Sequence, residues 1–184
     1  MYLNTHSYYS LRYGTFSPQK LLEQAKENGV KSFAITDINN TSACLAIVRE
    51  AHKYDIKPIV GIDFRNGIEQ VFVAIAKNNS GFQEMNEYLT PFLVNKTLIE
   101  NGIKEIPAKA PDFKEVTVIY PYKKGVHYQL KKHEYLGIKT SDLDYIRIKK
   151  VDCSKAVILQ TVTFTNKRDF NAHRLLRAID KNTL

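Results

Sequence analysis

Apolar residues alternate between strand-like and helix-like spacing through the first third of the chain. Residues 2–5 and 58–64 are predicted to be strands, and the short apolar run over 32–36 is typical of a buried strand in a parallel sheet. Residues 18–28 and 41–54, which lie between these segments, carry apolar side chains at helical spacing. Repeated strand and helix units predict right-handed crossovers, and therefore an α/β fold whose parallel sheet is either doubly wound or closed into a barrel.

Capping and turn residues mark several boundaries of these elements. Ser17 is expected to cap the first helix, with Pro18 in its first position. Asn66-Gly67 is the strongest hairpin signal in the chain. A later helix is expected to begin at Ser80 and to end at Thr90-Pro91, because proline disfavours a helical residue before it.

The second half of the chain is less regular, and it shows no repeat, linker or low-complexity segment. The expected elements are strands over 70–76, 116–120 and 156–161, short helices within 92–111, near Gln129 and over 141–146, and a closing helix over 166–180.

Composition places the chain among ordinary globular proteins. Its 184 residues are 43% hydrophobic and 25% charged, which argues against a disordered chain. No apolar run approaches the roughly 20 residues that a membrane helix needs, and the start, MYLNTHSYYS, lacks the features of a signal peptide. Cys44 and Cys153 are too few for a disulfide framework. We therefore expect a cytoplasmic protein with no membrane partner.

The net charge of +8 raises the question of nucleic-acid binding. The lysines, however, come as scattered doublets at 123–124, 131–132 and 149–150, and no run of five or six like charges occurs. No aromatic residues interleave with them as a stacking platform would require. Solvated faces are favoured over a functional basic patch, and a DNA-contacting surface of Lys and Arg stays open as a weaker alternative.

Candidate chemistry is sparse among the histidines and carboxylates. None of the five histidines has the spacing of a zinc site, and the sequence lacks the dinucleotide, P-loop and nucleophile-elbow motifs. Asp37 follows the strand over 32–36, and Asp63 ends the strand over 58–64. Each could bind a metal, act as a base or cap a helix, and for both residues capping is the commoner role. Surface positions are expected for His52, His127 and His133, and a hydrogen-bonded core position for His173.

Five segments together carry a family resemblance: THSYYSLRYG, LLEQAKENGVKSFAITDIN, KPIVGIDF, AIAKNNSGFQEMN and RDFNAHRLLRAI. In this order they resemble the N-terminal PHP (polymerase and histidinol phosphatase) domain of bacterial DNA polymerase III alpha subunits, in the form found in Bacteroidetes. The resemblance implies a distorted seven-stranded (β/α) barrel. It also implies that residues 1–184 are a single PHP domain, an N-terminal fragment of a much longer subunit, and the chain indeed ends in or just after a helix at RAIDKNTL.

Active members of that family hold metal ions with histidines and carboxylates at strand ends, and most of those ligands are replaced here. By the resemblance, the replaced ligand positions fall on Asn4, Tyr13, Ile38, Val71, Thr161 and Thr163. Three ligand positions keep a suitable side chain: His6, Asp37 and Asp63, the last on a shorter arm than the family's glutamate.

Three ligands are too few to hold the two or three metal ions of a phosphoesterase. The resemblance therefore implies a vestigial site with no catalytic residues and no cofactor, or at most one weakly bound zinc, manganese or magnesium ion on His6, Asp37 and Asp63. The alternative is a residual metal-dependent phosphoesterase or proofreading 3′–5′ exonuclease. That alternative requires ligands such as His127, His133 or Asp152 to converge on His6.

The function that the resemblance implies is structural. The parent chain would be a DNA-directed DNA polymerase, a nucleotidyltransferase of DNA replication, whose polymerising carboxylates lie outside this chain. The PHP domain would stabilise that polymerase. Its implied partners are the remaining polymerase domains, the proofreading exonuclease subunit and other replisome proteins, with DNA bound through the parent polymerase.

Overall fold

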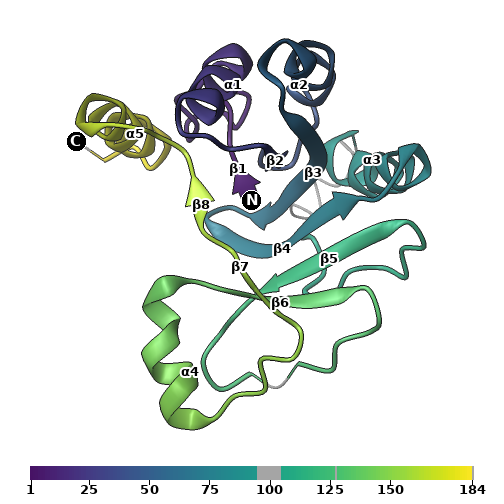
Figure 1. Ribbon diagram of the computed structural model, residues 1–184. Helices are drawn as coiled ribbons and strands as arrows, with labels where there is room; N and C mark the ends of the chain where they lie inside the picture. The colour runs from purple at the N-terminus through teal and green to yellow at the C-terminus, as the bar shows by residue number, and fades with distance from the viewer. Residues whose placement is uncertain (95–104, 127, 184) are drawn as a thin grey trace. The chain divides into compact units, whose positions relative to one another are not determined.

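The computed structural model describes residues 1–94, 105–126 and 128–183, and the chain forms two compact units (Figure 1). The first unit comprises residues 1–62 and 161–184, and the second comprises residues 63–160. Strand β3 (Lys57–Asn66) begins in the first unit and ends in the second.

The first unit is built on four parallel strands. Strand β1 (Tyr2–Thr5) lies between β2 (Ser32–Ile35) and the two-residue β8 (Thr161–Val162), and the first part of β3 pairs with the far side of β2. Thr5 is paired with Ile35 on one side and with Val162 on the other. The carboxyl ends of β1, β2 and β8 therefore meet at one edge, where loops build sites in parallel sheets.

Helices accompany these strands as the sequence pattern predicts. Helix α1 (Pro18–Glu27) lies between α5 (Lys167–Asp180) and α2 (Cys44–Glu50) in Figure 1, and η1 (Ala51–Tyr54) follows α2 directly. Leu21, Leu22 and Ala25 form the buried stripe of α1. The predicted cap is confirmed, because the Ser17 side chain accepts a hydrogen bond from the Lys20 amide at 3.1 Å.

The second unit mixes strand directions. The end of β3 turns through Gly67, which has a φ of 57°, into β4 (Glu69–Ala76). Strand β5 (Val116–Pro121) pairs antiparallel with β4, whereas β6 (Glu134–Ile138) and β7 (Ala156–Ile158) continue parallel to β5. The remaining elements are α3 (Asn79–Val94), η3 (Thr140–Asp142) and α4 (Leu143–Lys149).

The predicted α/β class is confirmed, with eight strands in the described residues where the resemblance implied seven. Two predicted helix boundaries were wrong. Helix α2 begins at Cys44 rather than Thr41, with Ala43 as a cap that offers no side-chain acceptor. Helix α3 continues through Pro91, because a proline removes one hydrogen bond of the helix without having to end it.

Residues 105–160 differ most from the expectation. No helix forms near Gln129 among the described residues, and β6 was not predicted at all. The expected strand over 156–161 is interrupted after Ile158, and Leu159, which follows the break, is buried and donates its amide to Ile138. Short helices were expected within residues 92–111. Residues 95–104 of that range lie outside the described residues. No helix among the described residues is long and apolar enough to cross a membrane.

Replacing Gly14 by alanine tests how tightly the loop after β1 is packed. A Cβ at this position would lie 1.8 Å from the Ser7 carbonyl oxygen, so backbone must move to admit a methyl group. Gly14→Ala is expected to lower the free energy of unfolding by about 2 kcal/mol or more, measured by urea denaturation. The control is Ser42→Ala, and equal stability of the two variants would contradict the described packing.

Candidate metal centre

Two of the three predicted ligands lie at the carboxyl edge of the first unit's sheet. His6 directly follows β1 and donates its backbone amide to Val162 of β8 at 2.9 Å, and Asp37 follows β2. Both side chains are buried, His6 completely and Asp37 to within 1%. The strand order thus brings them to the same edge.

The Asp37 carboxylate is already supplied with hydrogen-bond donors from its own unit. It accepts from the Ser7 amide at 2.7 Å, from the Ser7 hydroxyl at 2.6 Å and from the Ser10 hydroxyl at 2.6 Å. Ser10 in turn accepts from the Ile38 amide at 3.0 Å. These bonds hold the loop after β1 against the loop after β2, so Asp37 stabilises the contact between the two loops.

Neutral side chains, Asn4 and Thr161, occupy two positions where the resemblance predicts that active family members carry ligands. Asn4 donates its side-chain amide to the Thr161 hydroxyl at 3.1 Å and accepts from the Thr36 hydroxyl at 2.9 Å. Thr36 also accepts from the Thr5 amide at 3.0 Å. This network links β1, β2 and β8 without any charge, and an uncharged amide and hydroxyls are poor substitutes for the imidazole and carboxylate that hold catalytic metal ions.

Tyr13, which the resemblance places at a carboxylate position of the family, packs its ring beside His6. The two ring centroids are 5.2 Å apart in an edge-to-face arrangement. On its other side Tyr13 contacts His173 at 4.9 Å, and the Arg177 guanidinium lies 5.2 Å from the Tyr13 centroid. His173 is half-buried, with Nδ1 2.7 Å from the Tyr13 carbonyl oxygen, so the predicted hydrogen bond forms outside the deep core.

The third predicted ligand, Asp63, belongs to the second unit and is held by a cation. The Arg65 guanidinium donates to Asp63 Oδ2 from Nε at 2.9 Å and from Nη2 at 2.8 Å, and Gln70 donates to Oδ1 at 2.9 Å. The side chains of Asp63 and Arg65 are 0% and 7% exposed. A buried carboxylate needs such a partner, because removing a lone charge from water is costly.

These contacts do not suit a metal ion. Within the described residues, no three histidine, cysteine, aspartate or glutamate side chains are grouped so that they could hold one. Asp63 already has a positive partner that would repel a second cation. Of the further ligands that a nuclease would need, His133 and Asp152 are exposed in the second unit, and His127 lies outside the described residues.

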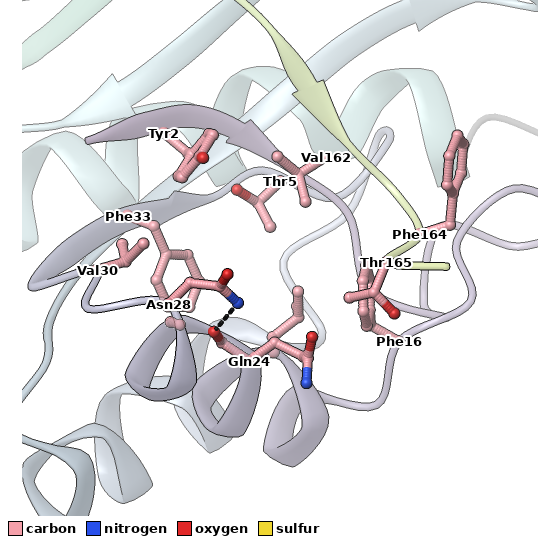
Figure 2. A pocket seen from close by; sticks show the side chains of 12 residues that line it. Tyr2, Thr5, Phe16, Gln24, Asn28, Val30, Phe33, Val162, Phe164 and Thr165 are labelled. Atoms are coloured by element: carbon pink, nitrogen blue, oxygen red, sulfur yellow. Dashed lines mark hydrogen bonds between the residues drawn. The ribbon is translucent and has the colours of Figure 1, made fainter. Parts of the chain in front are cut away.

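A separate hollow in the first unit lies between α1 and strands β1, β2 and β8 (Figure 2). Its volume is about 370 Å³, and none of its lining side chains is a carboxylate, histidine, lysine or arginine. Phe16, Phe33 and Phe164 supply much of its apolar wall, and Asn28 donates to the Gln24 carbonyl at 2.8 Å. Without an acid or base, this hollow is not a hydrolytic site.

The family model described as "PHP domain" matches residues 3–165. The chain belongs to the PHP domain family. The resemblance stated from the sequence is thereby confirmed at the family level, while the comparison with the Bacteroidetes form stays a prediction.

Curated relatives are DNA polymerase III alpha subunits. The subunit of Ureaplasma parvum is 26% identical over 167 residues, which cover 91% of this chain and 15% of that protein. The Escherichia coli subunit is 31% identical over 91 residues, 46% of this chain and 8% of that protein. This PHP domain chain thus spans less than a sixth of the relatives' length. An amidohydrolase structure from Chromobacterium violaceum covers 94% of this chain and 96% of its own at 11% identity and a TM-score of 0.45.

The residues that hold the PHP carboxylates were not predicted from the sequence. Arg65 could have been found, because side chains two residues apart on a strand face the same side, and Arg65 follows Asp63 at that spacing. Gln70 becomes a neighbour only through the hairpin that Asn66-Gly67 predicts. For Ser7 and Ser10 no local signal exists, because their contact with Asp37 depends on how two loops meet.

Removing the Arg65 side chain tests how much the ion pair with buried Asp63 contributes to the free energy of unfolding. Arg65→Met is expected to lower the free energy of unfolding by about 3–5 kcal/mol, because the carboxylate would stay buried without its cation. The double variant Asp63→Asn/Arg65→Met removes both charges and is expected to recover most of that loss. Urea denaturation measures both, and a loss below about 1 kcal/mol for Arg65→Met would show that the pair behaves like an exposed one.

The two cysteines should differ sharply in reactivity. Burial, reinforced by the negative charge of Asp37, raises the pKa of Cys44 to about 12, whereas Cys153 is exposed. At pH 8 only about one Cys44 side chain in ten thousand is then a thiolate, the reactive form. We expect one fast thiol in native protein with a disulfide reagent, two after unfolding, and no fast phase in Cys153→Ser. Two equally fast native thiols would contradict the described burial.

Proposed function

We propose that this PHP domain is non-catalytic and serves as a structural module of a DNA polymerase III alpha subunit. The observation that carries the proposal is the Asp63–Arg65 ion pair. The Arg65 guanidinium donates hydrogen bonds to the carboxylate that a metal-dependent site would need as a ligand. The family match and the names of the relatives support the assignment to the polymerase. On this proposal the chain is the N-terminal part of a longer polymerase subunit.

The first unit supports the proposal independently. Its candidate ligand Asp37 binds three donors from Ser7 and Ser10, and the Asn4–Thr36–Thr161 network joins three strands with neutral groups. Such bonds stabilise the carboxyl edge of the sheet, where an active member of the family would position metal and substrate. The same residue positions therefore serve stability in place of hydrolysis.

The partners that fit this proposal are the other domains of the polymerase, the proofreading exonuclease subunit and further replisome proteins. DNA would be bound through the polymerase as a whole. The relatives' names support only the polymerase subunit itself. The exonuclease and replisome partners are what the family resemblance implies. A residual metal-dependent phosphoesterase is the competing function. Measuring metal content together with hydrolysis distinguishes this function from the non-catalytic one.

The test is metal content together with hydrolysis. Purified protein is incubated with manganese or zinc, freed of unbound metal and assayed by elemental mass spectrometry, with turnover of a phosphomonoester and of a DNA 3′ end measured in parallel. We expect far less than one metal ion per chain and no turnover. His6→Ala/Asp37→Asn is the matched control, and any trace of metal or activity that survives in it comes from elsewhere.

Two or three metal ions per chain together with turnover, both lost in the control variant, would overturn the non-catalytic assignment. One stoichiometric ion without turnover would overturn the argument from Asp63 and Arg65, because the pair is proposed to take the place of a metal.

A further inference from the structure

The second unit contains a hollow that the proposed function does not use. It has a volume of about 580 Å³ and lies between the loop after β5, the start of β6 and the carboxyl end of α4. Leu130, Leu136 and Val151 belong to its apolar lining and to the small hydrophobic core of this part of the chain. A hollow of this size with an apolar floor has room for a planar ring.

Three tyrosines contribute to the wall of the hollow. Tyr122 and Tyr145 have ring centroids 6.5 Å apart. Tyr128 is held in place at its hydroxyl, which donates to the Pro121 carbonyl at 2.8 Å and accepts from the Lys123 amide at 2.9 Å. All three rings are half-buried, so each keeps part of its surface accessible. These tyrosines do not interleave with the lysine doublets along the sequence, but the fold brings both kinds of residue to one hollow.

Lysines border the same hollow. Lys149, Lys150 and Lys155 line it, and the Lys124 ammonium lies 4.9 Å from the Tyr145 ring centroid. Lys155 is oriented by the carbonyl oxygens of residues 130 and 131, at 3.3 and 2.5 Å. Among the described residues, no carboxylate forms an ion pair with any of these four lysines.

One carboxylate also lines the hollow, and its oxygens are occupied. Asp152 accepts from the Ser154 amide at 2.9 Å and from the Ser154 hydroxyl at 3.1 Å. The four lysines therefore outnumber the single carboxylate, and the hollow is positive at its border and aromatic at its wall.

We propose that this hollow binds single-stranded nucleic acid. Unpaired bases can stack on exposed tyrosine rings, and lysines at the border can neutralise the phosphates that connect those bases. A duplex hides the faces of its bases, so it could use only the lysines. Binding in this hollow is independent of metal chemistry in the first unit, so metal content and binding of nucleic acid are separate measurements.

Fluorescence anisotropy of the whole 184-residue chain with a labelled oligothymidylate of about 12 nucleotides tests the proposal, since single-strand sites span about 4–16 nucleotides. We expect binding at low salt that is tighter than binding to a duplex of the same length. The logarithm of affinity should fall with the logarithm of salt concentration with a slope of about −2 to −3, as three or four phosphate contacts require.

The variants separate stacking from charge. Tyr145→Ala is expected to weaken binding about tenfold, and Tyr145→Phe, which keeps the ring, should bind as the unchanged protein does. Lys149→Gln/Lys150→Gln should reduce the magnitude of the salt slope by about 1.4, because two phosphate contacts are lost. The first unit offers a matched control in Lys26 and Tyr54, where the ammonium lies 5.8 Å from the ring centroid. Tyr54→Ala and Lys26→Gln should leave affinity unchanged.

Several results would overturn the proposal. One is equal affinity for single strand and duplex, and another is equal loss in the Tyr54→Ala control. Binding by Tyr145→Ala that matches the unchanged protein would also exclude stacking in this hollow. Absence of binding to both oligothymidylate and oligouridylate at low salt would end the proposal for DNA and RNA alike. Circular dichroism of each variant confirms that it is folded before affinities are compared.

Discussion

Burial of a carboxylate is the constraint on which the rest of this PHP domain depends. A negative charge that leaves water must find a cation or several hydrogen-bond donors, and in the metal-binding members of the family metal ions meet this need. In this chain, hydrogen-bond donors and a cation from the protein itself stabilise the buried carboxylates. Arg65 and Gln70 serve Asp63 in the second unit, and Ser7 and Ser10 serve Asp37 in the first.

The two buried carboxylates differ in the kind of partner that holds them. Asp63 has a positive partner, so the pair is neutral overall and its disruption leaves a buried charge. The Asp37 carboxylate accepts three short hydrogen bonds, which tie one loop to another. Around His6 the space is filled by the Tyr13 ring, which in turn packs on His173 of α5. Asp63, Asp37 and His6, the three predicted ligands, therefore each make contacts that stabilise the fold.

Much of the fold could be predicted from local pattern, because short apolar runs and caps such as Ser17 act over a few residues. The prediction failed where tertiary contacts decide. Pro91 lies within α3, and β6 forms beside β5 in a stretch whose sequence, KKHEYLGIK, has no clear strand period. For the candidate site, the positions of His6 and Asp37 at one sheet edge followed from strand order. Their actual partners did not, since Ser7, Ser10 and Tyr13 meet them only through loop packing.

Thermal unfolding with and without divalent metal tests the central claim most directly, because a ligand bound by the native state alone must raise its stability. If internal donors have taken the place of metal, the melting temperature in 1 mM manganese or zinc, roughly a thousandfold above a micromolar dissociation constant, should match that in chelator to within about 1 °C. A site of that affinity would add about 4 kcal/mol and raise the melting temperature by about 8 °C or more. Such a rise, abolished by Asp63→Asn, would contradict the account.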